Sequence, residues 1–467
     1  MNVYITNTTR SIGFWLAISI LSCLLNSCES FVEIALPATQ LTGEAVFQDV
    51  ATADAALTHI YSKMRNEVLV QGTSIGLSAL LSNYADEMDY YSTSGLPAQE
   101  FYQNSLIPSN NTVTSTWNGT YNLIYAANSI IEDVTVSTGI STENKQRLLG
   151  EAYFIRAYLH FYLVNLFGDV PYVNTTDYEI NKSIHKLSTP LVYNNINTDL
   201  LQAIALLPIN YFGTGRTRPN QSTAHALLAR TMLYTEKWSE AITYSDLVIN
   251  ATTMYNWVAN LNNVFLNTST GTIWQLAPQF SGNNTLEAQT FQFTTAPPPT
   301  FALRNDLVDE FETGDLRRTN WIGTVTDGTQ NWYFPNKYKE NASTSASLEY
   351  SILFRLEEQF LIRAEAKAQL NDLGNAKLDL NKIRNRAGLT NTTAISQTEL
   401  LTAIIEERRK EFFTELGHRW FDLKRTGTAS SVLSSKKPGW DAKDLLWPLP
   451  ESELLLNGNL TPQNPGY

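Results

Sequence analysis

The stretch Ser222–Val248, STAHALLARTMLYTEKWSEAITYSDLV, decides the fold class of this chain. Its apolar and small residues recur every three or four positions over 222–235 and again over 239–248, which is the spacing of one face of a helix. The polar break Glu236-Lys237-Trp238 separates the two segments. Small side chains stand where two packed helices must approach closely: Ala226, Ala229 and Ala241. The stretch therefore predicts a helical hairpin of the kind that stacks in tetratricopeptide-like proteins.

The same pattern returns later in the chain. Residues 353–370 and 375–387 form a second predicted hairpin around Asn371-Asp372-Leu373-Gly374, again with recurring alanines. One long helical segment ends at Gly168 with Pro171 just beyond it, which is a usual helix stop. The other predicted helices cover 47–64, 73–84, 117–134, 143–167, 196–206 and 397–414. We expect a mainly α protein built from helix pairs.

Residues 250–350 lack the helical pattern and predict an irregular, partly β region. It interrupts a helical scaffold that covers about 44–248 and 350–425. The breaker Pro297-Pro298-Pro299 lies in the middle of this region. Three short β-like runs occur there: 272–276, 290–293 and 332–334. A second stretch, 85–113, is polar, aromatic and loop-like.

The N-terminal segment predicts a lipoprotein precursor. An apolar run from Ile12 ends in Leu25-Asn26-Ser27-Cys28, where a small residue precedes a cysteine, as lipoprotein signal peptidase requires. We expect removal of residues 1–27 and acylation of Cys28, with each acyl chain contributing about 0.8 kcal/mol per buried CH₂ to membrane binding. Residues 28–43 would form the anchor and an extended tether. An ordinary cleaved secretion signal or a short anchor helix is the alternative.

Composition argues against several classes of partner. The chain has 467 residues, a formal net charge of −12 and two cysteines, Cys23 and Cys28, both near the N-terminus. An acidic surface does not suit nucleic acid or anionic lipid headgroups. The mature chain would have no disulfide and would depend on its core for stability. Ten Trp, 22 Tyr and 20 Phe residues, with many Asn, Thr and Ser, are common in carbohydrate-binding proteins and in exported proteins generally.

The motifs that suggest catalysis have stronger structural interpretations. Gly72-Thr73-Ser74-Ile75-Gly76 fits the G-x-S-x-G nucleophile elbow, but that site needs parallel strands upstream, where this chain is predicted to be helical. The five histidines occur singly, without the spacing of a metal site. We therefore expect no catalytic residue, metal or cofactor. A glycoside hydrolase stays an alternative, because the sequence does not show whether two carboxylates face each other.

The candidate ligand-binding residues lie in segments predicted to be loops or short strands. An acidic group at 86–89 stands beside two tyrosines, which suggests a patch that binds sugar or Ca²⁺, although no Ca²⁺ loop with proper ligand spacing is present. Aromatic rings exposed on loops can stack on sugar faces. The full set of candidates is Asp86, Asp89, Tyr90, Tyr91, Phe101, Tyr102, Trp274, Phe280, Phe293, Trp321, Trp332 and Tyr333.

The segment 406–425 is dense in charged residues, yet it predicts an architectural role. Opposite charges three and four residues apart form pairs on helix surfaces, as in Glu406-Glu407-Arg408-Arg409-Lys410-Glu411. Arg419 directly precedes Trp420-Phe421 and can tie a helix end to the tail. We interpret the segment as a lock between parts of the scaffold.

Several ordered motifs resemble the SusD/RagB family of Bacteroidetes surface lipoproteins. The resemblance covers nearly the whole chain from Cys28 to the C-terminus. Its motifs are, in order, Phe31 and Pro37; Trp117-Asn118-Gly119 through Ala127-Asn128; Glu151–Tyr158 through Phe167–Pro171; Arg363–Ala366; Leu380–Gly388; Glu407-Arg408-Arg409 through Asp422-Leu423; Trp447–Pro450 with Glu453; and Gln463–Tyr467.

The resemblance implies a SusD-like fold, with one domain over 44–467 and an irregular, ligand-facing region at about 250–350. It also implies a protein without enzymatic activity that is anchored by lipid on the cell surface, at the outer membrane. Such a protein binds an oligosaccharide or polysaccharide and closes like a lid over a SusC-like TonB-dependent transporter. The motifs belong to the scaffold and specify no ligand contact. A surface glycoside hydrolase or esterase, and a peptide- or glycopeptide-binding importer component, are the alternatives.

Overall fold

The computed structural model describes residues 47–92, 95, 97–437 and 439–467, and residues 47–467 form one compact unit. The predicted signal peptide (1–27), the lipid anchor Cys28 and the tether (28–43) lie outside the described residues. Within the described ranges, no helix is both long and apolar enough to cross a membrane.

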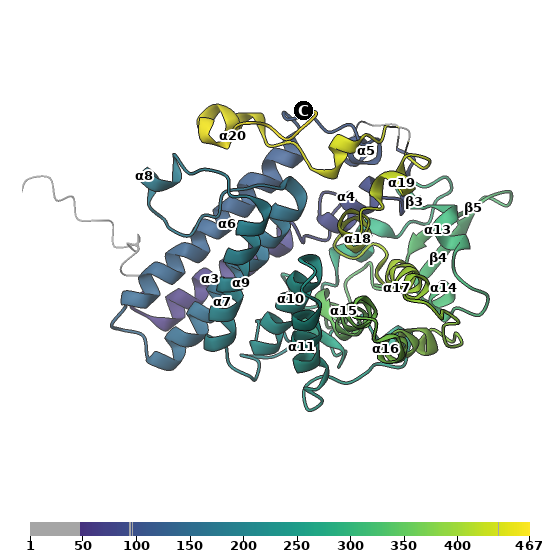
Figure 1. The fold of residues 1–467 in the computed structure, drawn as a ribbon, viewed down its shortest axis with the longest axis horizontal. Helices are drawn as coiled ribbons and strands as arrows, with labels where there is room; N and C mark the ends of the chain where they lie inside the picture. Colours follow the sequence, from purple (N-terminus) through teal and green to yellow (C-terminus); the bar gives the residue numbers. More distant parts are fainter. Residues whose placement is uncertain (1–46, 93–94, 96, 438) are drawn as a thin grey trace, which may run out of the picture. The chain divides into compact units, whose positions relative to one another are not determined.

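Helices dominate this unit, as predicted, and helices adjacent in sequence pack side by side (Figure 1). The main helices are α3 (Val50–Asn66), α4 (Leu77–Tyr84), α6 (Asn111–Val136), α7 (Thr142–Phe167), α9 (Thr189–Leu206), α10 (Gln221–Tyr234), α11 (Trp238–Ile249), α15 (Leu356–Gln369), α16 (Leu373–Arg386), α17 (Gln397–Phe412) and α18 (His418–Arg425). The packed series runs from α6 through α7, α9, α10, α11, α15 and α16 to α17, and α3 lies against α6 and α7.

Both predicted hairpins are confirmed: α10 packs against α11, and α15 packs against α16. Ala226, Ala229 and Ala241 are fully buried, so their small size lets the first pair of helices approach closely. Each hairpin turn contains a residue in the left-handed region, Glu236 at φ 58° and Asn371 at φ 62°. Asn tolerates this conformation better than most residues, and Glu236 adopts it because the turn between the packed helices requires it.

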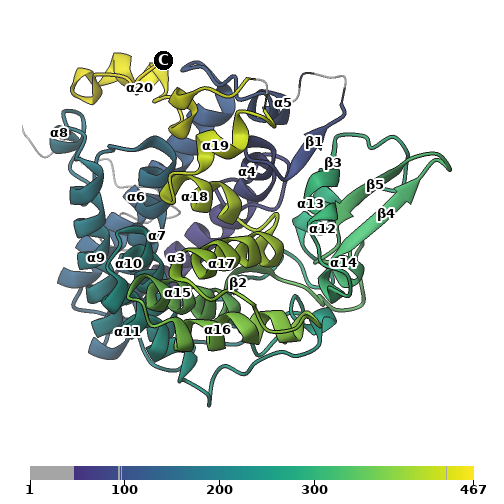
Figure 2. The same cartoon turned by 45° about the vertical axis from the view of Figure 1, so that its right-hand side comes forward.

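Two small antiparallel sheets take four of their six named strands from the region predicted to be irregular (Figure 2). The strands are β1 (Met88–Tyr90), β2 (Thr272–Leu276), β3 (Phe301–Leu303), β4 (Ile322–Thr326), β5 (Asn331–Pro335) and β6 (Ser351–Arg355). The larger sheet has the order β1-β3-β5-β4, and the smaller one pairs β2 with β6. The predicted strands at 272–276 and 332–334 are confirmed.

Three local predictions are wrong. Residues 290–293 are not a strand, because the first two of them are the end of helix α12 (Leu286–Phe291). The Thr285 side chain caps the first turn of this helix. The stretch 85–113 is not all loop, since it contains β1 and α5 (Pro97–Tyr102). Residues 353–355 belong to β6 rather than to a helix, because a run buried on both faces has no distinguishing periodicity.

Short elements complete the described chain. They are α8 (Tyr178–Asn181), α13 (Asn305–Asp309), α14 (Leu316–Asn320), α19 (Ala429–Leu433) and α20 (Glu451–Leu456), with 3-10 helices η2 (Leu261–Asn263), η3 (Ala442–Leu445) and η4 (Gly458–Leu460). Two hydrogen bonds fix the C-terminal tail to the end of α7. The backbone N–H of Trp447 donates to the Leu166 carbonyl at 2.8 Å, and Asn464 Nδ2 donates to the Phe167 carbonyl at 2.8 Å.

Part of the larger sheet is covered on both faces, while β4 and β5 also carry exposed residues. Its inner face packs into a buried cluster that includes Met88, Leu303 and Trp321. On its outer face, Ala302 and Trp332 form a smaller cluster with Phe293. Because both faces bury rings, large aromatic residues in this region stabilise the fold.

Buried ion pairs join α17 and α18 to the rest of the scaffold, which agrees with the lock interpretation of 406–425. Glu411 accepts hydrogen bonds from Arg355 at 2.5 Å, from Arg317 at 3.1 Å and from Arg386. Arg408 pairs with Asp422 at 2.7 Å. Removing one partner of such a buried pair leaves an uncompensated charge, which costs about 3–5 kcal/mol.

Candidate functional site

Asp86 is not a ligand-binding residue, contrary to the sequence prediction. It is fully buried and pairs with Arg419 at 2.7 Å, Arg409 at 2.9 Å and Lys436 at 2.9 Å. Burial alone would raise the pKa of Asp86, but the hydrogen bond from Arg419 and the charge of Arg409 hold it well below its usual value. The carboxylate therefore neutralises scaffold cations and has no free oxygen for a sugar hydroxyl.

Several of the rings predicted to be exposed are buried, so the structure contradicts their role as stacking platforms. Trp274 is fully buried with Phe154 and Tyr158, each at 5.0 Å between ring centroids. Trp321 is also fully buried and donates from Nε1 to the Leu261 carbonyl at 3.2 Å. The other buried rings are Phe101, which packs on Trp447, and Phe293 and Trp332 on the outer face of the sheet.

The remaining candidates on and after β1 do come together. Arg304 pairs with Asp89, and Tyr102 contacts both Asp89 and the Tyr90 ring. We call these four residues, together with Tyr91, the β1 patch. Arg304 Nη1 donates to Asp89 Oδ1 at 2.7 Å, and the Tyr102 hydroxyl donates to the same oxygen at 3.3 Å. The Tyr90 and Tyr102 rings stack at 6.2 Å between centroids with an interplanar angle of 27°.

Strand pairing positions the patch. Register places Asp89 opposite Ala302 and Tyr90 opposite Phe301, and Arg304 follows directly after β3. The Tyr91 N–H donates to the Thr300 carbonyl at 2.7 Å, which extends the pairing beyond β1. Tyr91 leaves 37% of its surface exposed, so its ring is the most accessible part of the patch.

Charge and burial set the chemistry of the patch. Burial raises the pKa of Tyr91 and of Tyr102, and the negative charge of Asp89 raises both further, so both phenols stay protonated donors at neutral pH. Behind the patch, Lys437 Nζ lies 4.0 Å from the centroid of the Tyr102 ring, a cation–π contact that fixes the ring. The patch thus offers rings, hydroxyl donors and one partly exposed carboxylate.

Arg304 also joins the patch to the helix that follows β3. Its guanidinium pairs with Asp89 at 2.7 Å and with Asp306 on α13 at 2.9 Å.

Two further candidates lie outside the patch. Phe280 is 62% exposed on the loop after β2, and that loop contacts residues 342–348 through the Thr344 N–H, which donates to the Gly282 carbonyl at 2.8 Å. Tyr333 packs against the inner core cluster, and the Arg318 guanidinium covers its ring at 4.7 Å.

Sequence reasoning missed two contributors, Arg304 and Lys437. Arg304 follows a three-residue strand and stands 215 residues from Asp89 in the chain, so no spacing rule connects the two. Lys437 belongs to a polar stretch that resembles an ordinary surface loop. Tertiary pairing alone brings them to the patch.

The motifs that suggested catalysis have structural roles. Gly76 is the N-cap of α4, and a Cβ there would lie 1.7 Å from the Gln71 carbonyl oxygen, so the close approach of two backbone segments requires glycine. The named strands pair only antiparallel within the described residues, so the parallel strands of a nucleophile elbow are not found there. Over the same ranges, no group of three or more His, Cys, Asp or Glu side chains could hold a metal ion.

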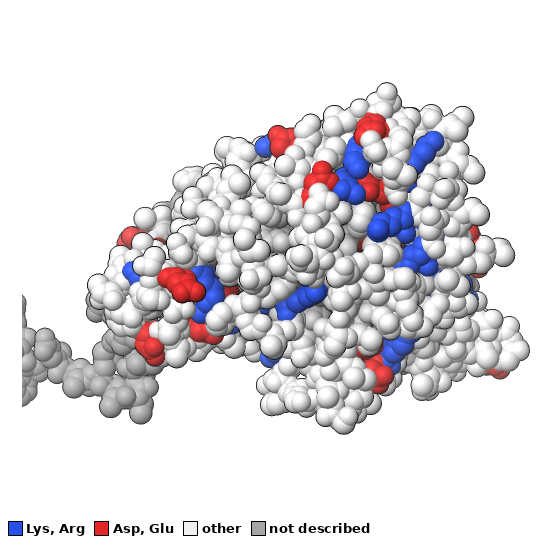
Figure 3. Space-filling view, turned by 90° about the horizontal axis from the view of Figure 1, so that it is seen from below, with Lys and Arg blue, Asp and Glu red and all other residues white. Residues whose placement is uncertain are grey.

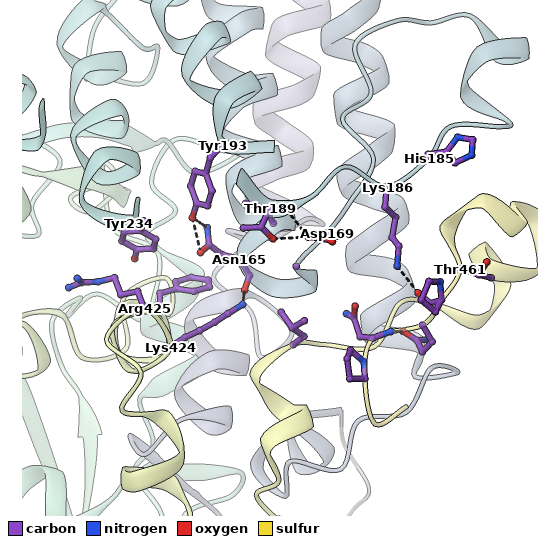
Figure 4. Close-up of a pocket in the computed structure, with 18 of the residues that line it drawn as sticks. Asn165, Asp169, His185, Lys186, Thr189, Tyr193, Tyr234, Lys424, Arg425 and Thr461 are labelled. Atoms are coloured by element: carbon purple, nitrogen blue, oxygen red, sulfur yellow. Dashed lines mark hydrogen bonds between the residues drawn. The ribbon is translucent and has the colours of Figure 1, made fainter. Parts of the chain in front are cut away.

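A cavity of about 690 Å³ lies between the end of α7, the start of α9, α18 and the tail (Figure 4). Its polar groups pair with one another across these segments. Lys424 Nζ donates to the Asn165 carbonyl at 2.6 Å, and Asp169 accepts from the Thr189 N–H at 2.7 Å. These bonds cap helix ends, so we assign the groups around this cavity to the scaffold.

One face of the molecule carries few charged side chains. In Figure 3 most of this face is uncharged, and some of its Lys and Arg side chains lie beside Asp or Glu.

Comparisons with known proteins agree with this architecture. The model of a SusD-like family, described as "Starch-binding associating with outer membrane", matches residues 42–233. SusD-like protein P2 of Formosa agariphila is 26% identical over 490 aligned positions, which cover 92% of this chain and 95% of that protein. The starch-binding protein SusD of Bacteroides thetaiotaomicron is 35% identical over 166 positions, which cover 32% of this chain and 28% of that protein.

Solved structures show the same fold. A SusD superfamily protein from Bacteroides vulgatus superposes with a TM-score of 0.79 at 22% identity, covering 90% of this chain and 99% of its own. A laminarin-binding SusD-like protein superposes with a TM-score of 0.73 at 24% identity, covering 89% of this chain and 99% of its own. The predicted SusD-like fold is confirmed.

Proposed function

We propose that this chain is a carbohydrate-binding protein of the bacterial cell surface and that it binds oligosaccharides at the β1 patch. The chain belongs to the SusD-like family. The observation that carries the proposal is the grouping of Tyr90, Tyr91 and Tyr102 around the Asp89–Arg304 pair. Relatives described as binding starch or laminarin support the ligand class.

Each part of the patch has a role in this proposal. The exposed Tyr91 ring stacks on the apolar face of a sugar ring. The Arg304 guanidinium donates hydrogen bonds to the sugar, while the Tyr102 hydroxyl oxygen and Asp89 accept them from sugar hydroxyls. Because Arg304 and Tyr102 hold Asp89 in place beforehand, little side-chain entropy is lost on binding.

Isothermal titration against a panel of neutral oligosaccharides tests the proposal, with chromatography of each mixture after the titration. We expect binding to at least one sugar without shortened products. Release of shortened oligosaccharides would show a glycoside hydrolase, and the absence of binding to every sugar would contradict the β1 patch as a site.

The proposed location requires the lipid anchor at Cys28. The family description, which includes association with the outer membrane, supports this location. Mass spectrometry of the mature N-terminus should find acylated Cys28 as the first residue, and the substitution Cys28→Ser should move the protein out of the membrane fraction. An intact N-terminus, or cleavage at another residue, would contradict the anchor.

The proposed partner is a SusC-like TonB-dependent transporter, over which this protein would close as a lid. The resemblance of this chain to SusD-like proteins supports the proposal. Affinity purification of the tagged protein from its own outer membrane should recover a β-barrel transporter of this class. Recovery of the protein alone under mild solubilisation would count against a stable complex.

A further inference from the structure

A groove on the helical scaffold has the composition of a second carbohydrate-binding site. It has a volume of about 560 Å³ and lies between α6, the segment 171–184 that contains α8, and the tail at 453–460. These three segments adjoin one another in Figure 1, away from β3 and β5. The rings that line the groove are Trp117, Tyr121, Tyr125 and Tyr178.

We propose that this groove binds a segment of a neutral oligosaccharide. The inference rests on the proposed function for its ligand class and adds a second site for that class. The rings, the amides and the charge balance of the groove each support it.

The rings form a fixed floor with accessible edges. Trp117 and Tyr121 are 4.8 Å apart between centroids, and the Tyr121 hydroxyl donates to the Pro171 carbonyl at 2.9 Å. Tyr125, one turn further along α6, is 51% exposed, and Tyr178 on α8 is 72% exposed. Rings that the scaffold already holds in place can stack on a sugar at little entropic cost.

Amide groups lie beside the rings. Asn118 and Asn122 are exposed one turn apart on α6. Asn181 donates from Nδ2 to the Thr175 carbonyl at 2.8 Å, which fixes its side chain at the groove. An exposed amide both donates and accepts, so Asn118 and Asn122 can pair with sugar hydroxyls.

The charge balance of the groove favours a neutral sugar over an acidic one. Lys182 and Glu453 are its only ionisable groups apart from tyrosines. Lys182 pairs with Glu179 beside the groove. The pKa of Glu453 is raised, because the effect of burial is larger than that of a hydrogen bond from Trp117, which lowers it. No unpaired cation therefore faces the groove to attract a carboxylate or sulfate.

Hydroxyl-radical footprinting with mass spectrometry tests the proposal on the purified full chain in a non-glycosidic detergent. The probes are maltohexaose, cellohexaose, laminarihexaose, mannohexaose and xylohexaose. We expect at least one to lower the oxidation of Tyr125 and Tyr178 at least about twofold, because a bound sugar covers most of an exposed ring. The exposed ring of Phe212, outside both sites, is the internal reference for radical dose.

Tyr91 reports on the β1 patch in the same experiment, which separates the two proposals. Protection of Tyr91 alone would overturn the groove as a site and leave the proposed function intact. Protection of Tyr125 and Tyr178 alone would support the groove and contradict the β1 patch. Protection of neither site by any probe would overturn both.

A variant adds a second measurement. Tyr178→Ala removes an exposed ring and should not affect folding. For a sugar that protects the groove, calorimetry should show affinity for that site lowered about tenfold. Phe212→Ala is the matched control and should leave this affinity unchanged. Equal affinity of Tyr178→Ala and the unmodified chain would contradict the role of the ring.

Discussion

The tryptophans of 272–334 and the tyrosines of 89–102 have similar sequence contexts and opposite environments. Both segments are rich in aromatic and polar residues and lack helical periodicity. Trp274, Trp321 and Trp332 are nevertheless buried, whereas Tyr90, Tyr91 and Tyr102 remain partly accessible. The three tryptophans pack into apolar clusters, whereas the first two tyrosines lie at and after the end of β1, an edge strand of the larger sheet.

The comparison shows that a loop-like sequence does not distinguish a buried ring from an accessible one. The tryptophans carry a large apolar area, and burying that area stabilises the fold. The tyrosines of the β1 patch combine a ring with a hydroxyl that hydrogen-bonds at the surface. The following substitutions should separate a stability effect in one region from a binding effect in the other.

Trp274→Ala should produce the largest effect, a loss of about 4 kcal/mol in the free energy of unfolding, because it leaves a cavity among Phe154, Tyr158 and Phe354. Denaturant unfolding followed by circular dichroism measures it. Trp274→Phe, which keeps an apolar ring, should lose much less. If the Trp274→Ala variant were fully stable but bound sugar more weakly, Trp274 would be a binding residue rather than a core residue.

Glu287→Gln should show a stability effect that depends on pH. Burial raises the pKa of Glu287 to about 7, so the folded state binds a proton more tightly than the unfolded state. The stability of the unmodified chain should therefore fall as pH rises from about 4.5 to 7, by about 3 kcal/mol from this group. The variant does not titrate, so its stability relative to the unmodified chain should rise over this range and level off above it.

Thermal unfolding at a series of pH values measures the difference, and the exposed Glu240→Gln on α11 is the control. Sugar affinity should stay the same for Glu287→Gln at each pH. A pH-independent stability difference would show that the buried carboxyl group is not protonated in the folded state.

Tyr91→Ala should change the free energy of sugar binding, and by less than Trp274→Ala changes the free energy of unfolding. Loss of one stacking ring should weaken sugar affinity by about 1 kcal/mol, which is roughly fivefold. Unfolding should change by less than about 0.5 kcal/mol, because the ring is partly exposed. Calorimetry and unfolding on the same preparation test both parts, and Tyr91→Phe should retain most of the affinity.

Phe280→Ala should have the smallest effect. Its ring is exposed on a loop separate from the β1 patch, so stability should change by less than about 0.5 kcal/mol and affinity for short sugars should be unchanged. Calorimetry with a longer oligosaccharide sharpens the test. A loss of affinity that appears only with the longer sugar would extend the binding surface to the loop after β2.

The helical part of the fold could be predicted from sequence because its signals are local. Both hairpins show helical spacing, small residues at close approaches and polar turns within about thirty residues. The sheets could be predicted only in part, because strands such as β1 and β3 have three residues each and pair across more than 200 positions. Short strands carry too few residues for a periodic pattern.

The candidate site could also be predicted only where its signals are local in sequence. Asp89, Tyr90, Tyr91 and Tyr102 lie near one another in sequence, so a local reading found them. Asp86 was assigned to the same patch because a buried acid and an exposed acid do not differ in sequence. Its three cations come from 409–436, more than 300 residues away, and only the tertiary structure shows them.

The hydrogen bonds between α4 and the C-terminal part of the chain constrain the order of folding. The Tyr84 hydroxyl donates to the Asp444 carbonyl, 360 residues later, and the Arg419 guanidinium binds Asp86 across 333 residues. A ribosome makes residues 84–86 first, so these groups have no native partner until synthesis is nearly complete. The chain therefore completes these contacts only after its C-terminal part has been made. A C-terminal truncation before Asp444 should for the same reason leave the early helices without a finished core.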